Sequence, residues 1–136
     1  MIGLVIVTQG RLAIELRATL EHVVGRQSQL ELVSIDGEPD IDRDRAKLVE
    51  AVARVDTGDG VVIVSDDMFG APASELAIPL VNGGKLDAVD GANLPVLIKL
   101  ATLRRGKCSV AEAVSLAQES GRKHIRYYPE SAARLS

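Results

Sequence analysis

Short apolar runs rich in Val, Ile and Leu alternate along the 136-residue chain with longer segments of helical periodicity. The runs at residues 2–7 and 61–64 are apolar almost throughout, which is typical of strands buried on both faces. Residues 30–35 and 86–89 are predicted as two further strands. Because strands and helices alternate, the chain is predicted to form an α/β domain with a mostly parallel sheet.

Helices are predicted after the first two strands. The first is expected to stop at Gly25, because glycine readily takes the left-handed backbone that ends a helix. The second has Asp42 as its expected N-terminal cap. The apolar positions that define these helices are Leu12, Leu16, Leu20, Val23 and Val24 in the first, and Val49, Val52 and Val55 in the second.

Two more helices are predicted in the second half of the chain. Residues 72–81 are expected to form a helix that kinks or ends early at Pro79, since proline cannot donate a backbone hydrogen bond. Residues 94–103 are expected to form the next, with Asn93 as its cap and Pro95 in its first turn.

The chain ends in a last helix and a candidate strand. Ser109 and Glu112 have the spacing of a capping box, and the helix that they begin is expected to stop near Gly121. The tail at residues 124–128 is a candidate for one last strand. Because the sequence has no internal repeat and no convincing linker, residues 1–136 are predicted to form a single domain.

The preferred topology is a flavodoxin-like sheet with strand order 2-1-3-4. In this order strands 1 and 3 are neighbours, and the helices that follow them pack on opposite faces of the sheet. The crevice at the carboxyl ends of these two strands is the topological switch point, where such folds place ligands. The residues after strands 1 and 3 are therefore the candidate site.

Two loops leave this crevice. Thr8, Gln9 and Gly10 follow the first strand, and the second loop begins with Asp66 and Asp67. Each loop precedes a predicted helix, whose first amide groups can bind an anion. Paired carboxylates in such a crevice indicate a functional site, although a solvated turn explains Asp66 and Asp67 equally well.

Composition excludes several classes of function. Aromatic residues make up 2% of the chain, which argues against stacking platforms for single-stranded nucleic acid or flavin. The net charge of −3 gives no electrostatic footprint for nucleic acid or an anionic membrane. No stretch approaches the roughly 20 apolar residues of a membrane span. No dinucleotide, Walker-type or nucleophile-elbow motif follows the strands, so no cofactor is expected. The single cysteine and the lack of a signal peptide or membrane span predict a cytoplasmic protein.

The remaining reactive residues form no recognisable catalytic grouping. His22 and His124 lie apart from any ligand or triad spacing, so packed or solvated roles are favoured for both. One cysteine, Cys108, cannot form an internal disulfide or a cysteine-based metal site, and no metal site is predicted. The basic cluster of Arg104, Arg105 and Lys107 is interpreted as a complement to a helix C-terminus.

Four segments together resemble the mannose-type enzyme IIA domains of the bacterial phosphoenolpyruvate-dependent sugar phosphotransferase system. They are, in order, GLVIVTQGRLA, VDTGDGVVIVSDDMFGAPASELAI, DGANLPVLIKL and QESGRKHI. The resemblance implies a flavodoxin-like fold and a homodimer that exchanges its antiparallel C-terminal edge strand. It also implies a phosphoryl carrier in sugar transport, which accepts phosphate on a histidine from the phosphocarrier HPr and passes it to a IIB partner.

Matched by motif, the family's phospho-accepting histidine falls on Gln9, and its assisting aspartate falls on Asp67. A glutamine amide nitrogen has its lone pair delocalised into the carbonyl, so it cannot replace imidazole as a nucleophile. The phosphate-binding positions implied by the resemblance are Thr8, Gly10, Met68, Phe69, Gly70 and Ala71.

Three interpretations therefore stand side by side. The chain is a IIA component of the transferase pathway, a catalytically silent regulatory or partner-binding relative, or a small-molecule sensor that uses the same crevice. Loss of phosphoryl transfer through Gln9 is favoured over its retention, which leaves the assignment as an enzyme open. A place at the surface of a membrane sugar permease is compatible with the first interpretation.

Overall fold

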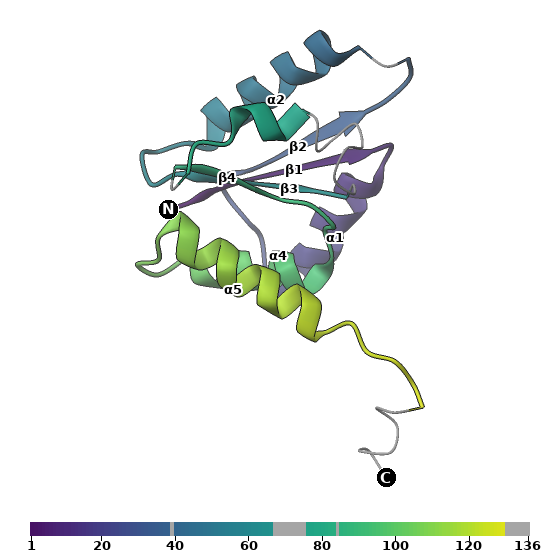
Figure 1. Ribbon diagram of the computed structural model, residues 1–136, viewed down its shortest axis with the longest axis vertical. Helices are drawn as coiled ribbons and strands as arrows, with labels where there is room; N and C mark the ends of the chain where they lie inside the picture. Colours follow the sequence, from purple (N-terminus) through teal and green to yellow (C-terminus); the bar gives the residue numbers. More distant parts are fainter. Residues whose placement is uncertain (39, 67–75, 84, 130–136) are drawn as a thin grey trace.

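The computed structural model describes residues 1–38, 40–66, 76–83 and 85–129 (Figure 1). Its strands form a four-stranded parallel sheet in the order β2-β1-β3-β4, which confirms the predicted α/β class and strand order. The strands are β1 (Gly3–Gln9), β2 (Leu30–Ile35), β3 (Val61–Ser65) and β4 (Leu86–Val89). The helices are α1 (Leu12–Val24), α2 (Ile41–Val55), the 3₁₀ helix η1 (Ile78–Leu80), α4 (Leu94–Leu103) and α5 (Val110–Lys123).

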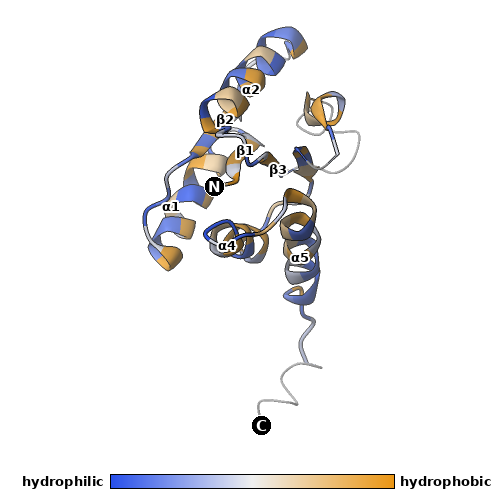
Figure 2. Ribbon diagram, turned by 90° about the vertical axis from the view of Figure 1, so that its left-hand side faces the viewer, coloured by the Kyte–Doolittle hydropathy of each residue, from blue (hydrophilic) through white to orange (hydrophobic). Residues whose placement is uncertain are grey.

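The sheet separates two hydrophobic cores. Leu4 and Ile6 of β1 face the core formed with α1, α4 and α5, and Val5 and Val7 face the core formed with α2. Figure 2 shows α2 on one side of the sheet and α4 and α5 on the other. The side chains of Leu4, Val5, Ile6 and Val7 are all fully buried, as the continuous apolar run predicts for a strand covered on both faces.

Three helix predictions need correction. Asp40, not Asp42, caps α2, because its carboxylate accepts a 3.0 Å hydrogen bond from the Arg43 amide. The buried face of α2 consists of Asp44, Leu48, Ala51 and Val55, whereas Val49 is 47% exposed. In α1 likewise, Leu20 is buried and Leu12 is 43% exposed. In both helices the apolar spacing indicates the helix and most of its core-facing positions, but Leu12, Val23 and Val49 lie exposed.

Gly121 does not end α5, which continues to Lys123. A Cβ atom at position 121 would lie 2.5 Å from Cγ2 of Val96 in α4. The glycine is therefore needed for the close approach of α4 and α5, not for a helix stop. The predicted caps of these two helices are confirmed, since Asn93 accepts from the Val96 amide at 3.0 Å and Ser109 from the Glu112 amide at 3.1 Å.

The ends of three predicted elements also differ. Thr8 and Gln9 belong to β1 instead of a turn. Of the helix predicted at residues 72–81, only residues 76–81 are described, and η1 contains Pro79 there. Residues 125–127 form no strand within the chain and lead away from the body of the molecule beyond α5 (Figure 1).

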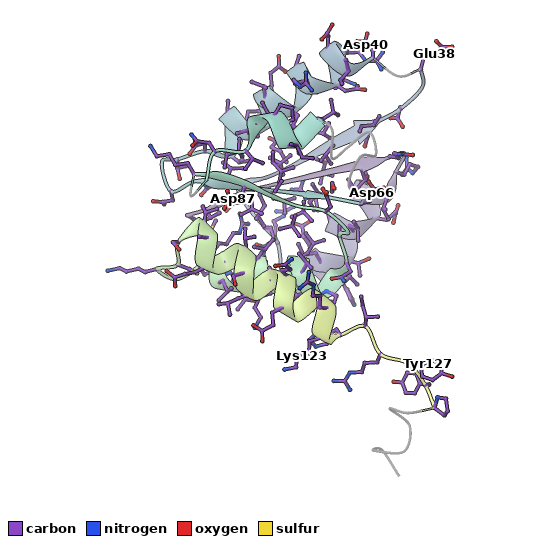
Figure 3. All side chains as sticks on the ribbon, viewed as in Figure 1. Glu38, Asp40, Asp66, Asp87, Lys123 and Tyr127 are labelled. Carbon is purple, nitrogen blue, oxygen red and sulfur yellow. The ribbon has the colours of Figure 1, made fainter. Side chains whose placement is uncertain are left out.

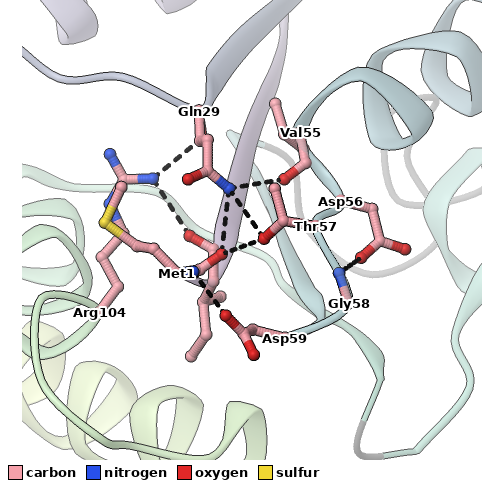
Figure 4. Close-up of polar contacts among 9 residues, drawn as sticks. Met1, Gln29, Val55, Asp56, Thr57, Gly58, Asp59 and Arg104 are labelled. Atoms are coloured by element: carbon pink, nitrogen blue, oxygen red, sulfur yellow. Dashed lines mark hydrogen bonds and ion pairs between the residues drawn. The ribbon is translucent and has the colours of Figure 1, made fainter.

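Arg104 joins α4 to the amino ends of β1 and β2. It is 2% exposed, and its guanidinium donates to the carbonyls of Ile2, Ser28 and Gln29 at 3.2, 2.6 and 2.9 Å. Nearby, Gln29 Nε2 donates to the carbonyls of Met1 and Val55 at 3.1 and 3.0 Å (Figure 4). The sequence predicts Arg104 as a complement to a helix C-terminus, and it is the C-cap residue of α4, but its buried guanidinium also connects α4 to the starts of β1 and β2.

Candidate functional site

The carboxyl ends of β1 and β3 form the switch point predicted from the sequence. These strands are paired neighbours at the centre of the sheet. After β1 the chain enters α1 on one face, and after β3 it returns at Leu76 and Ala77 in the core of the opposite face. The two chain segments therefore diverge at this edge, which is where doubly wound folds hold their ligands.

The loop after β1 is held by Thr8. This side chain is fully buried, and its hydroxyl accepts a 2.7 Å hydrogen bond from the Ala13 amide in the first turn of α1. Arg11, at the N-cap position, makes no capping hydrogen bond with its side chain. The Thr8 hydroxyl therefore supplies the cap of α1 and fixes the path of Gln9 and Gly10, whose φ is +56°.

Gln9 is exposed at the end of β1, and its backbone amide points toward the neighbouring strand β3. Amides of β1 alternate in direction, since Gly3 donates toward β3 at Gly60 and Leu4 toward β2 at Gln29. The Gln9 amide donates to Oδ2 of Asp66 at 3.4 Å. β3 ends at Ser65, opposite Val7, so the strand offers no further carbonyl to the Gln9 amide. The Asp66 carboxylate accepts the hydrogen bond from this amide instead.

Ser65 ties the end of β3 to the loop after β4. Its hydroxyl donates to Oδ1 of Asp90 at 2.7 Å, and its carbonyl accepts from the Ala92 amide at 2.7 Å. Ser65 is 1% exposed, so both of these polar groups are satisfied away from solvent. Polar contacts therefore flank Asp66 at the switch point: its own contact with Gln9, and the contacts of Ser65 with the loop after β4.

The structure brings together only part of the predicted site. Thr8, Gln9, Gly10 and Asp66 meet at the edge of the sheet. Asp67, together with Met68, Phe69, Gly70 and Ala71, lies outside the described residues. The motif resemblance selects Asp67 as the assisting aspartate, whereas the carboxylate that the structure describes in contact with the Gln9 amide is that of Asp66.

Both histidines lie away from Gln9. His22 is exposed in the last turn of α1, about 15 Å along the helix axis from Leu12 at the usual rise per residue. His124 follows α5, where its Nδ1 lies 2.8 Å from the Ser120 carbonyl. Figure 3 shows Lys123, its neighbour, well apart from Asp66. Neither imidazole lies beside Gln9.

The described residues contain neither a candidate metal cluster nor a helix suited to crossing a membrane. Among those residues, no group of three or more His, Cys, Asp or Glu side chains could hold a metal ion. None of the described helices is long and apolar enough to span a membrane.

The fold and the polar switch point define a doubly wound α/β protein with a candidate anion site. The chain belongs to the mannose-type IIA family of the sugar phosphotransferase system, since the family model described as "PTS system fructose IIA component" matches residues 3–118. It is 29% identical over 129 residues to the mannose-specific EIIAB component of Escherichia coli K12. The match covers 92% of this chain and 39% of that relative, so the chain spans well under half of the relative's length.

Solved structures have the same fold. The EIIA component from Streptococcus agalactiae superposes with a TM-score of 0.83 at 19% identity, covering 94% of this chain and 98% of that one. The mannose/sorbose-specific IIA subunit from Enterococcus faecalis gives a TM-score of 0.80 at 21% identity, with 93% of each chain covered.

Proposed function

We propose that residues 1–136 form one IIA domain that has kept the fold and partner surface of its family but does not carry phosphate on position 9. It would act in the cytoplasm, docking on HPr or a IIB component without accepting a phosphoryl group from either. Gln9 carries this proposal, because it stands at the switch point where the family resemblance expects histidine. An amide side chain can hydrogen-bond there, yet it offers no nucleophilic lone pair.

The neighbourhood of Gln9 supports the same proposal. The backbone amide that could contact an anion at this position donates to Asp66. A phosphoryl group placed beside that carboxylate would meet like charge at short range, which opposes its binding. The aspartate is therefore compatible with a partner-binding surface and unfavourable for a stable phosphorylated state.

Phosphorylation in a reconstituted system tests this proposal. When the chain is incubated with phosphoenolpyruvate, enzyme I and HPr, its intact mass should not change, while HPr in the same tube gains a phosphoryl group. An acid-labile adduct on His22 or His124 would overturn the proposal, and so would a stable adduct elsewhere on the chain. Co-sedimentation with unphosphorylated HPr then measures whether the docking surface is intact.

We also propose that the protein is a homodimer in which the tail of each copy pairs with β4 of the other. β4 is an edge strand that pairs with β3; elsewhere among the described residues it has one isolated bridge, at Leu86. A groove of about 480 Å³ runs beside it and is lined in part by Asp90 and Ile125. Pairing would protect this open edge, which a strand of a second copy can cover.

The composition of the tail supports a second copy as the occupant. Ile125, Tyr127 and Tyr128 are 76%, 72% and 60% exposed, which is a large apolar area within a four-residue segment. The tail also carries Arg126, and β4 and its following loop carry Asp87 and Asp90. These charges complement each other across an antiparallel pairing.

Deleting residues 125–136 should convert the protein from dimer to monomer at micromolar concentration in sedimentation velocity. Deleting only residues 130–136 is the matched control, because it keeps the candidate strand, and this shorter deletion should leave the dimer intact. A full-length monomer at that concentration would contradict the exchange, as would a dimer that survives the longer deletion.

A further inference from the structure

We infer that the hydrogen bond between Ser65 and Asp90 positions the Asp66 carboxylate against Gln9. Ser65 and Asp90 are thus positioning residues of the candidate site, although neither is in direct contact with Gln9 among the hydrogen bonds described. The inference rests on the proposed function only in taking Gln9 and Asp66 as the functional pair.

Ser65 is the last point at which β3 is fixed to the sheet. Its Cα is in register with that of Val7 on β1, and β4 has already ended at Val89, the partner of Val64. After Ser65, β3 has no further strand pairing with either neighbour among the described residues. On the β4 side the support comes instead from two 2.7 Å hydrogen bonds: the Ser65 hydroxyl donates to Asp90, and the Ser65 carbonyl accepts from the Ala92 amide.

The direction in which Asp66 leaves the sheet depends on this anchor. Asp66 follows Ser65 directly, and its Oδ2 accepts from the Gln9 amide at 3.4 Å. That separation lies at the long end of hydrogen-bond geometry, so a small further displacement of β3 would break the contact. The hydrogen bond from Ser65 to Asp90 is short and accepted by a carboxylate, a combination that makes it one of the stronger kinds.

Asp90 also connects the site to the groove beside β4, because it is one of the residues that line the groove. Asp90, which accepts the hydrogen bond from Ser65, therefore lines the surface where we propose that the second copy binds. Figure 3 shows Asp66 on the sheet edge, at the end where β1 and β3 stop.

Amide hydrogen exchange by NMR on the full chain tests the inference without any phosphoryl transfer. Ser65→Ala and Asp90→Ala should each lower the protection of the Gln9 amide about tenfold, the size expected for loss of one hydrogen bond to a charged group. Asp90→Asn keeps an oxygen that accepts from Ser65, so its Gln9 amide should retain protection. Ser120→Ala removes another buried hydroxyl, and it should leave the Gln9 amide unchanged.

The amide of Val7, also on β1, separates positioning from general loosening. If Ser65→Ala and Asp90→Ala leave the Gln9 amide at its original protection, the inference is wrong. Equal losses at Gln9 and Val7 would also overturn it, since they would report a weakened sheet. Because the readout needs no phosphate, a failed phosphorylation proposal would leave this result unaffected.

Discussion

Gln9→His is expected to convert the chain from one that takes no phosphoryl group into one that takes up to one group per chain from phosphorylated HPr. The new imidazole would offer a ring nitrogen with a free lone pair near neutral pH. That nitrogen would form the bond to phosphorus as the bond to the HPr imidazole breaks, and HPr would leave with its own nitrogen restored. Position 9 is exposed at the end of β1, so a donor protein can reach it.

Gln9→Asn is the matched control, because it keeps an amide at the same position and supplies no acceptor. The labelled fraction is measured by intact mass after incubation with phosphoenolpyruvate, enzyme I and HPr. An unlabelled Gln9→His variant that remains folded, in a mixture where HPr is labelled, would mean that the second loop has lost function as well. The substitution at position 9 would then not be the sole cause of the silent chain.

Asp66 determines how stable that adduct should be. In the double variant Gln9→His/Asp66→Asn, the carboxylate next to position 9 becomes neutral while a side-chain oxygen can still accept from the backbone amide. Less like charge near the phosphoryl group would favour its retention. The Asp66 carboxylate would thus act as a source of repulsion, whereas the family resemblance assigns an assisting role to the neighbouring Asp67.

The two central strands, β1 and β3, are predictable because they are buried on both faces along almost their whole length. Residues 30–35 and 86–89 are also predicted as strands, and the structure has β2 and β4 at those residues, although both are edge strands with partly exposed side chains. The buried faces of the helices were harder to predict, since several apolar side chains stay exposed and Asp44 is buried on α2. Gly121 shows a second limit, because whether a glycine ends a helix or admits a neighbouring one depends on packing between distant segments.

The location of the candidate site followed from topology, but its contacts did not. Strand order alone places the residues after β1 and β3 at one edge, and the structure confirms that placement. The contact of Asp66 with Gln9 depends on where β3 stops, and hydrogen bonds between Ser65 and the loop after β4 hold that end. Such contacts between segments more than 20 residues apart have no local sequence signature.

Arg104 is the clearest case of a residue whose role only the fold reveals. Besides the three backbone carbonyls at the amino ends of β1 and β2, its Nη2 donates to Oε1 of Gln27 at 2.9 Å. Gln27 is itself held in place, because its backbone amide donates to the Glu21 carboxylate at 2.8 Å. This hydrogen bond lowers the pKa of the Glu21 carboxyl. Burial, and secondarily the charge of Arg105, lowers the pKa of Arg104 to about 10, so the guanidinium stays charged at neutral pH.

Arg104→Met should lower the free energy of unfolding by at least about 3 kcal/mol, because it leaves several buried acceptors without a donor. Arg104→Lys should recover less than half of this loss, since one ammonium group cannot reproduce the planar set of guanidinium donors. Arg105→Met is the matched control at an exposed position, and it should change stability by no more than about 0.5 kcal/mol. Urea unfolding followed by circular dichroism measures all three variants. Comparable stabilities for Arg104→Met and Arg105→Met would show that the buried guanidinium does not hold α4 to the sheet.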